Sequence, residues 1–541
     1  MFWADEIAAA ASGPQVVNDS KTPSGTIHIG ALRGVVIHDV LNRALRDRGL
    51  PSRFLYGIDD LDPMDSATLA TREGVSEYMG KPLADVPAPR GSAHSSWARH
   101  FAASFLDTFE RLGIRPEFYW ASEQYRAGRF DDFIREALDK AAEVRRVYRE
   151  VSKVEHGDDW YPIQVICENC GRIGTTFVDG WDGSTVAYRC LPDFVAWARG
   201  CGHAGRVSPF GGRAKLPWNL HWVAKWRLFG VTVEAAGKDL STRGGSRDRS
   251  DALAREVFGV TPPRNVPYEF LTIGGRKMKS SAGTGAAAHA MVELLPAELI
   301  RFLMLRYRPQ AAIEFEPSGE TVPRLFDEYD SWVTEAVAGP SEGSDPVEAA
   351  HRRRVVELAQ LPGNELPRYF LPPFVQVATY AQMPAATPAG IAEQIGRHRG
   401  APLAGEELHE LEARLATAER WLPAFAPERI RFRVALDELP PEAASLTEQQ
   451  RSYLRQLADA LEGSDAWDGE ALQTAIFEGA RGAGLGANKA FNAVYLSLLG
   501  RASGPRAGWL LASLDRRFVV DRLRVAAGAA EPAATNGGSV R

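Results

Sequence analysis

Two short segments of the sequence combine residue types that suit the binding of a nucleotide phosphate. Residues 22–30 read Thr-Pro-Ser-Gly-Thr-Ile-His-Ile-Gly. Glycines let a backbone approach a phosphate closely, and a helix that begins near Gly30 would present free N–H groups and its positive dipole end. His28 could then donate to a phosphate oxygen whose charge grows in the transition state. The competing interpretation is a strand-to-helix turn with an incidental histidine.

The second segment, residues 274–283, reads Gly-Gly-Arg-Lys-Met-Lys-Ser-Ser-Ala-Gly. Lysines and hydroxyls on a loop flanked by glycines can close over a triphosphate and neutralise a leaving pyrophosphate. Taken alone, the segment is more typical of a basic surface loop. No Walker A pattern occurs in the sequence.

Four cysteines form a third candidate site and lie within 35 of the 541 residues. Cys167 and Cys170, followed by glycine, match half of a zinc knuckle, in which a tight turn holds two thiolates. Cys190 and Cys201 could supply the other two ligands, although the ten residues between them exceed the usual gap; His203 is the substitute if Cys190 points away. Four protein ligands leave no open position, so the zinc would be structural. The alternative is four buried thiols.

The elements around residues 22–30 follow from local patterns. Residues 16–17 begin as a strand, apolar residues recur at helical spacing over 31–48, and residues 54–58 form a buried strand. This strand–turn–helix–strand unit favours a parallel α/β sheet with a ligand at the carboxyl ends of its strands.

The predicted secondary structure changes after about residue 293. Before that point, residues 231–233 and 270–273 read as strands, with a helix over 251–258 between them. Beyond it the strand signals vanish, which predicts a helical C-terminal part. Helical periodicity recurs at 296–306, 347–361, 406–422, 447–461, 469–480 and 488–499.

Composition excludes several classes of protein. With 45% apolar and 24% charged residues the chain is a globular one, and its length predicts about three or four domains. No apolar stretch is long enough to span a membrane, and the N-terminal run 7–11 lacks the positive start of a signal peptide. The net charge of −6 requires any nucleic-acid partner to use a local basic surface. Crowded cysteines favour a reducing compartment, so we expect a cytoplasmic protein.

The two phosphate-binding segments together resemble the HIGH and KMSKS motifs of class I aminoacyl-tRNA synthetases. Further motifs between and beside them resemble class I lysyl-tRNA synthetases, the archaeal type also found in some bacteria. These are Asp59-Asp60-Leu61-Asp62-Pro63, Lys215-Leu216-Pro217-Trp218, Trp222, Lys225-Trp226, Gly237-Lys238-Asp239, Gly244-Gly245-Ser246 and Pro267-Tyr268-Glu269. The resemblance runs through about residues 15–290.

This resemblance implies a Rossmann-type catalytic domain with a zinc-binding connective insertion, followed by an all-helical C-terminal domain. The implied boundaries are 1–90 and 216–292 for the two halves of the catalytic domain, 91–215 for the insertion with its zinc segment 167–203, 293–390 for a helical stem-contact region, 391–525 for a helical anticodon-binding domain and 526–541 for a disordered tail. A monomer is expected.

The resemblance also implies a reaction. ATP and lysine would form lysyl-adenylate with release of pyrophosphate, and the lysyl group would pass to tRNA; Mg²⁺ would accompany ATP. The implied residues are His28, Lys277 and Lys279 for catalysis, Ser24, Gly25, His28, Gly30, Gly237, Asp239, Lys277 and Met278 for ATP, and Thr22, Trp218, Trp222 and Tyr268 for the amino acid.

Three tryptophans, Trp218, Trp222 and Trp226, share one helical face at i, i+4 and i+8. Core packing is the interpretation we favour for Trp226. For the other two the resemblance favours the substrate pocket, since aromatic faces suit a lysine side chain.

The sequence departs from the family at four places. Ala31 stands where the family usually has Asn, Leu240 where it has His, and His221 where it has an acid. The lysine loop carries its second lysine at Lys279, three places early, with Ala282 before the last glycine. Three hypotheses follow: a lysine–tRNA ligase with a retuned site, a paralogue for another amino acid or a non-tRNA acceptor, or a non-catalytic RNA-binding relative.

Overall fold

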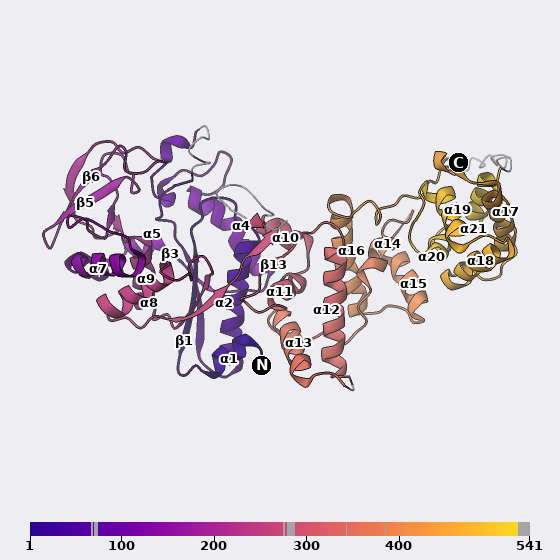
Figure 1. Cartoon of the computed structure of the whole chain (residues 1–541), viewed down its shortest axis with the longest axis horizontal. Coiled ribbons are helices and arrows are strands. Elements are labelled where there is room, and N and C mark those ends of the chain that lie inside the picture. Colours follow the sequence, from indigo (N-terminus) through magenta and orange to yellow (C-terminus); the bar gives the residue numbers. More distant parts are fainter. Residues whose placement is uncertain are drawn as a thin grey trace, which may run out of the picture. The chain divides into compact units, whose positions relative to one another are not determined.

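The computed structural model describes residues 1–66, 69, 74–273, 276–277, 287–341, 343–384 and 386–528 (Figure 1). The chain divides into two compact units. The first comprises residues 1–316 and 332–366, and the second comprises residues 317–331 and 367–541. None of the described helices is both long and apolar enough to cross a membrane.

A five-stranded parallel sheet forms the centre of the first unit and confirms the expected fold class. Its strands, in spatial order, are β10 (Arg264–Tyr268), β9 (Val233–Gly237), β1 (Gln15–Lys21), β2 (Ser52–Ile58) and β3 (Glu117–Trp120). The chain moves outward from β1 through β2 to β3 and then returns to β9 on the other side. The strand order therefore reverses between β1 and β9, which is where open α/β sheets bind their ligands.

Helix α2 (Gly30–Asp47) joins β1 to β2 and matches the expected helix over 31–48. The apolar positions that carry its periodicity are all buried: Leu32, Val35, Val36, Val40, Leu41 and Leu45. Gly49 follows the helix with φ +79°, a backbone conformation that glycine adopts without strain. The short helix α1 (Trp3–Ala9) packs against α2.

Other strand expectations need correction. The strand expected at 231–233 is β9, which starts two residues later, and β10 gives no signal that was recognised in the sequence. The expected strand 270–273 is β11 (Leu271–Ile273), which belongs to a separate sheet with β12 (Arg276–Lys277) and β13 (Ile313–Glu314). The helix expected over 251–258 begins earlier, as α9 (Ser246–Ala252), and continues as a π-helical turn.

Between β2 and β9 the chain forms helices and small antiparallel sheets. The helices are α4 (Trp97–Arg111), α5 (Ala121–Arg126), α6 (Asp131–Asp139), α7 (Ala141–Ser152) and α8 (Trp218–Phe229). The sheets are β5 (Thr176–Trp181) with β6 (Val186–Cys190) and β7 (Ala204–Val207), and β4 (Gln164–Val165) with β8 (Ala214–Lys215). Strand β3 belongs to the central sheet although it lies within the range 91–215.

The first unit closes with α10 (Ala288–Leu294), α11 (Ala297–Leu305) and α13 (Pro346–Ala359). A buried arginine joins α11 and α13 to α2. Arg301 of α11 donates to Asp39 of α2 at 2.7 Å, to the carbonyl of Leu358 in α13 at 2.9 Å and to that of Leu112 at 3.3 Å.

The second unit is helical throughout its described residues, as the sequence predicts. It begins with the N-terminal part of α12 (Thr321–Ala338). Its further helices are α14 (Phe374–Tyr380), α15 (Pro388–Arg399), α16 (Glu406–Ala424), α17 (Glu448–Glu462), α18 (Gly469–Gly482), α19 (Ala487–Leu499), α20 (Ala507–Ala512) and α21 (Arg516–Ala526). Residues 317–331 of α12 and its preceding turn belong to this unit. Residues 529–541, most of the expected disordered tail, lie outside the described residues.

We predict that Arg301→Leu lowers the free energy of unfolding by roughly 3–5 kcal/mol, because it leaves the Asp39 carboxylate buried without its cation. Thermal and urea unfolding measure the loss. Arg324→Leu is the matched control: the Arg324 ion pair with Glu320 is exposed, so its removal should change stability by less than about 1 kcal/mol. Equal effects of the two variants would contradict the prediction.

Candidate functional site

The polar residues of the first unit gather where the central strands end. Thr22 follows β1, Asp59 and Asp60 follow β2, and Asp239 lies two residues after β9. Parallel strands end at one edge of a sheet, so these residues come together although they are far apart in the chain. The edge carries two buried ion pairs and one carboxylate that pairs with no described cation.

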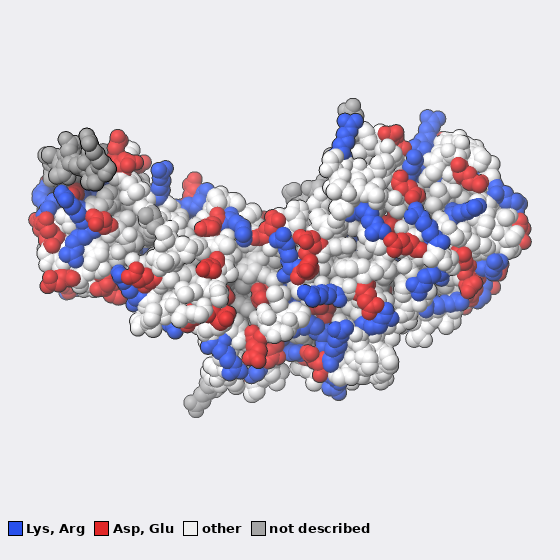
Figure 2. Space-filling model, turned by 180° about the vertical axis from the view of Figure 1, so that it is seen from behind, with Lys and Arg blue, Asp and Glu red and all other residues white. Residues whose placement is uncertain are grey.

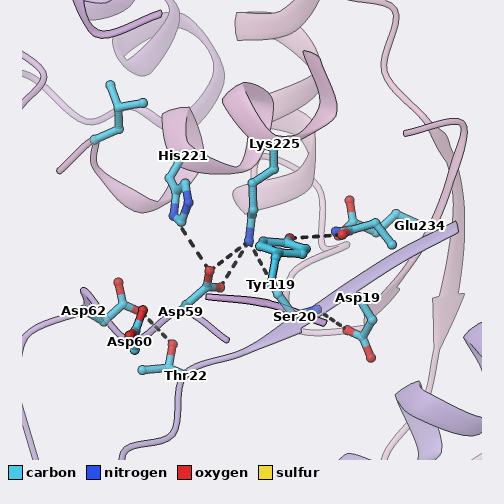
Figure 3. A network of polar contacts seen from close by, with 12 residues as sticks. Asp19, Ser20, Thr22, Asp59, Asp60, Asp62, Tyr119, His221, Lys225 and Glu234 are labelled. Carbon is cyan, nitrogen blue, oxygen red and sulfur yellow. Dashed lines mark hydrogen bonds and ion pairs between the residues drawn. The ribbon is translucent and has the colours of Figure 1, made fainter. Parts of the chain in front are cut away.

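Lys225 and Asp59 form the first ion pair (Figure 3). The Lys225 Nζ lies 3.1 and 3.2 Å from the two Asp59 oxygens and 2.8 Å from the Ser20 Oγ. The two charged side chains are almost completely buried. Because Asp59 follows β2, Ser20 belongs to β1 and Lys225 to α8, the pair joins three elements, and its carboxylate and ammonium neutralise each other away from water.

Lys215 and Asp62 form the second ion pair, with 2.6 Å between Nζ and Oδ1. The hydroxyl of Thr22 donates to the other oxygen of Asp62 at 2.5 Å. The proton of Thr22 is therefore committed, and its oxygen lone pairs remain as acceptors. Thr22 can thus receive a hydrogen bond from a ligand ammonium group but cannot donate one without releasing Asp62.

Asp60 has hydrogen bonds but no cationic partner among the described residues. It accepts from the main-chain N–H of Ser122 at 2.8 Å and from its hydroxyl at 2.6 Å. Burial raises the pKa of Asp60 to about 6, and the hydrogen bonds from Ser122 only partly offset this. Burial thus favours the protonated, neutral form of the Asp60 carboxyl.

His221 occupies the position where the resembled family usually carries an acid. Its Nδ1 lies 4.0 Å from Asp59 Oδ1, and the rings of Tyr125 and Phe130 are packed beside it, with centroids 5.3 and 5.4 Å away. Burial, assisted by the nearby ammonium groups of Lys225 and Lys215, lowers the pKa of His221 well below its usual value. The imidazole is therefore neutral, and the edge carries one negative charge fewer than a carboxylate would supply.

A second polar network, which includes Tyr119 and Glu234, lies beside the first ion pair (Figure 3). Asn18 donates to Glu234 at 2.9 Å and accepts from the Tyr119 hydroxyl at 3.0 Å. The indole N–H of Trp226 donates to the other oxygen of Glu234. Burial raises the pKa of Tyr119, which stays a neutral donor. This network places Trp226 in the core, as expected from the sequence.

The exposure of the tryptophans of α8 increases from Trp226 through Trp222 to Trp218. Trp222 is 5% exposed and Trp218 is 37% exposed, with ring centroids 4.6 Å apart. The guanidinium of Arg247 lies over Trp222 and Trp226, 5.5 and 4.8 Å from their ring centroids. Of the two tryptophans expected in the amino-acid pocket, only Trp218 presents an open face.

The segment 22–30 has the local geometry that its glycines predict. A β-carbon at Gly30 would lie 2.9 Å from the His28 Nδ1 and 3.2 Å from the carbonyl oxygen of Leu271, so only glycine lets β11 approach the start of α2. The indole of Trp97 donates to the Ser24 carbonyl at 3.2 Å and holds the loop. Gly25 is buried beside it. His28 forms an isolated β-bridge with Ala287.

The second expected nucleotide contact lies at the ends of β9 and β10. A β-carbon at Gly237 would lie 2.9 Å from the carboxylate of Asp239, so this turn is tight. The Tyr268 hydroxyl would lie 2.7 Å from a β-carbon at Gly34 of α2, which shows that the ring packs on that helix. Burial raises the pKa of Tyr268, so its hydroxyl stays protonated. Leu240 follows in the same turn and donates its N–H to the Gly237 carbonyl at 3.0 Å.

Only the base of the lysine loop is described. Lys277 pairs with Thr272 in the β11–β12 ladder. Met278, Lys279 and Ala282 lie outside the described residues. Arg33 of α2 donates to the carbonyl of Phe270 at 3.1 Å and to that of Ala311 at 2.7 Å, and thereby ties the strand that carries the loop to the helix that follows the first segment. Burial lowers the pKa of Arg33 to about 10, which leaves it cationic at neutral pH.

The four cysteines converge. Their Sγ atoms all lie within 4.8 Å of one another, with 3.7 Å between Cys167 and Cys201 and between Cys170 and Cys190. Tetrahedral zinc with Zn–S bonds of 2.3 Å requires sulfurs about 3.8 Å apart, so the arrangement fits that ion. His203 is outside the cluster, and its main-chain oxygen accepts from the Cys190 N–H at 2.8 Å.

The cysteine segment is joined to the Asp60–Asp62 loop by main-chain hydrogen bonds. Ile173, three residues after Cys170, donates to the carbonyl of Gly80 at 2.7 Å. Gly80 in turn donates to the Met64 carbonyl at 2.9 Å, just beyond Asp62. A tightly held knuckle therefore stabilises the loop that carries two of the site carboxylates.

Several of these residues were part of a motif but received no role from the sequence. Lys215, Lys225, Asp59 and Asp62 belong to this group. Two signals were available: a run of acids directly after a buried strand, and lysines inside otherwise apolar segments. A lysine in such a segment is almost never fully buried unless it is paired.

Comparisons with known proteins agree with this geometry. Residues 1–361 match the family model described as tRNA synthetases class I (K), and residues 408–527 match that of an anticodon binding domain. The chain is 35% identical to lysine–tRNA ligase 1 of Methanosarcina acetivorans over 97% of its own length and 98% of the relative's. It is 34% identical to the lysine–tRNA ligase of Archaeoglobus fulgidus, over 97% and 100%, and 32% identical to that of Pyrococcus horikoshii, over 97% and 99%.

The raised pKa of Asp60 predicts a pH dependence. The folded state binds the Asp60 proton more tightly than the unfolded chain does, so the stability that this proton contributes is present below about pH 4 and is lost as the pH rises through about 6. Asp60→Asn should therefore gain roughly 2–3 kcal/mol relative to the wild type between about pH 4 and pH 7. Urea unfolding at several pH values measures it, with the exposed Asp107→Asn as control. A pH-independent difference would refute the assignment.

Proposed function

The chain belongs to the family of class I tRNA synthetases specific for lysine, and we propose how its residues divide the two steps of lysine–tRNA ligation. The observation that carries this conclusion is similarity over almost the full length to lysine–tRNA ligases. The carboxyl edge of the sheet, where the first signature segment leads into α2 and β11 approaches that helix, supports the same assignment.

In the first step, a lysine carboxylate oxygen attacks the α-phosphorus of ATP and pyrophosphate leaves. We assign Gly25, Gly30 and Ser24 to the close approach of the phosphates, because a side chain at Gly30 would collide with β11 and His28. His28 would donate to a phosphate oxygen as its charge grows. Lys277 and Lys279 would neutralise the pyrophosphate.

We assign the adenosine to the tight turn after β9, beside Gly237 and Asp239, and to Met278 of the lysine loop. We assign Tyr268 to the amino-acid pocket. Its ring extends from the end of β10 and packs against α2. Magnesium would enter as the counter-ion of the ATP phosphates. Among the described residues only the cysteines form a group of potential metal ligands, so we assign it no protein ligand.

We assign the side chain of the lysine substrate to Thr22, Trp218 and Trp222. Thr22 offers acceptor lone pairs because its proton is held by Asp62. Trp218 offers an open aromatic face for the methylene chain and cation, and Trp222 supports it from within. In the second step, a ribose hydroxyl of the terminal tRNA adenosine attacks the lysyl carbonyl carbon and AMP leaves.

One observation favours a second candidate, a paralogue that activates another amino acid. The neutral imidazole of His221 and the apolar Leu240 both replace groups that are ionic or polar in the family. The edge is therefore less negative than a site built for a diammonium substrate. A less polar side chain would suit it, whereas the third candidate, a non-catalytic RNA-binding relative, has no such observation behind it.

Aminoacylation and ATP–pyrophosphate exchange with a panel of amino acids, each with and without tRNA, test the assignment. We expect lysine to be charged, and His28→Ala to lower kcat by about 10²–10³ because a donor to the reacting phosphate is lost. His94→Ala, an exposed histidine, should be neutral. Charging with a different amino acid would favour the paralogue, and no exchange with any amino acid would exclude both enzymes.

We assign structural zinc to Cys167, Cys170, Cys190 and Cys201, where it would hold the knuckle closed. Removal of the metal by a chelator, or by Cys170→Ser, should increase hydrogen exchange over residues 160–215 and, through Gly80, over the Asp60–Asp62 loop. Residues 448–528 of the second unit should keep their protection. Metal analysis should find about one zinc per chain. Unchanged exchange in metal-free protein would contradict a structural metal.

A further inference from the structure

The arginines at the C-terminal end of the second unit are already engaged within the protein. Arg524 lies 2.9 Å from Asp459 and 2.6 Å from Glu462, and Arg522 donates to the Leu436 carbonyl at 2.9 Å. On the face shown in Figure 2, basic and acidic side chains are interspersed over the described residues. An RNA contact in this unit therefore has to use cations that no carboxylate neutralises.

The corner between α18 and α19 offers such cations beside an exposed ring. Phe477 of α18 is 44% exposed, and no other Phe, Tyr or Trp ring in the described part of the second unit is as open to solvent. Its ring contacts Phe491 of α19 edge to face, with centroids 4.9 Å apart and planes at 79°. Phe491 packs partly on the helical core and supports the exposed ring.

Two cations lie on the same two helices as this pair. Arg481 lies four residues after Phe477 on α18 and therefore on the same helical face. Lys489 lies in the first turn of α19, two residues before Phe491. Both side chains are exposed, and neither has an ion pair with a described carboxylate, including the neighbouring Glu478.

The loop between α18 and α19 leaves space for a ligand to approach the two phenylalanine rings. Residues 482–486 are Gly-Ala-Gly-Leu-Gly, and β-carbons added at Gly482, Gly484 or Gly486 would meet no atom within 4 Å. Gly486 caps α19 without a side-chain hydrogen bond, so the first N–H groups of this helix remain accessible to an anion.

We propose that Phe477, Phe491, Arg481 and Lys489, here named the Phe477 platform, stack one unpaired nucleobase of tRNA and hold its flanking phosphates. Resting on the proposed function, this inference names the residues of the second unit that contact the RNA. The matched anticodon binding domain, residues 408–527, contains all four.

The chemistry of the platform favours a single-stranded loop over other partners. Duplex RNA hides the faces of its bases, whereas an unstacked base can lie on an aromatic ring while cations contact the backbone. A protein partner would have to bring an apolar side chain for the ring and separate acidic side chains for the two cations. An RNA loop satisfies all of these groups together.

Binding of a fluorescent hairpin, the anticodon stem-loop of a lysine tRNA, tests the platform on the full-length protein. Phe477→Ala should weaken binding roughly tenfold, because stacking contributes in this range, and Phe477→Trp should restore it. Arg481→Ala and Lys489→Ala should each reduce the dependence of log affinity on log salt by roughly 0.7. The control Leu436→Ala removes another exposed apolar side chain and should have no effect.

Hairpins with one base removed at each loop position identify the stacked base. One abasic position should weaken binding to the wild type roughly tenfold and have no further effect on Phe477→Ala. Equal binding by the wild type and Phe477→Ala would overturn the platform, and a protein contact would then explain the exposed ring. Full lysine charging with no dependence on Phe477 would refute only this inference, whereas Phe477-dependent hairpin binding without any charging would refute only the ligase assignment.

Discussion

The buried ion pair between Lys225 and Asp59 is the interaction on which the catalytic edge depends. It joins α8, which returns from the insertion, to the end of β2 and, through Ser20, to β1. Two charges taken out of water are tolerated only as a hydrogen-bonded pair, so neither side chain can move without exposing the other to an apolar surrounding. The ends of the central strands, and the loops that follow them, are consequently held in one arrangement.

The charge balance around this pair shapes what the edge can bind. Lys215 neutralises Asp62, and His221 stays uncharged because it is buried between two ammonium groups. Asp60 has no cationic partner in the part of the chain that the structure describes, and burial raises its pKa to about 6. Two described groups that remain available to a ligand are the acceptor lone pairs of Thr22 and the exposed ring of Trp218. These few groups would decide between lysine and a less polar amino acid.

The two units separate two kinds of recognition. The first unit offers a dry, pre-paired edge suited to chemistry on small substrates, where hydrogen bonds are strong because water is excluded. The second unit offers an exposed ring and unpaired cations, which suit a solvated and mobile RNA loop. Arg414, by contrast, is buried in the second unit with Asp330 at 2.7 Å and Glu410 at 2.6 Å, and it serves the fold.

The sequence by itself determined the features that depend on near neighbours. Helix α2 followed from periodicity, the turn before it from its glycines, and the cysteine knuckle from its spacing, because backbone preferences and tight turns act over a few residues. Only the tertiary structure decided that Lys225 pairs with Asp59, 166 positions away, and that β3 completes the central sheet. Such pairings depend on which strands lie side by side, and burial then selects the partner that leaves no charge unpaired.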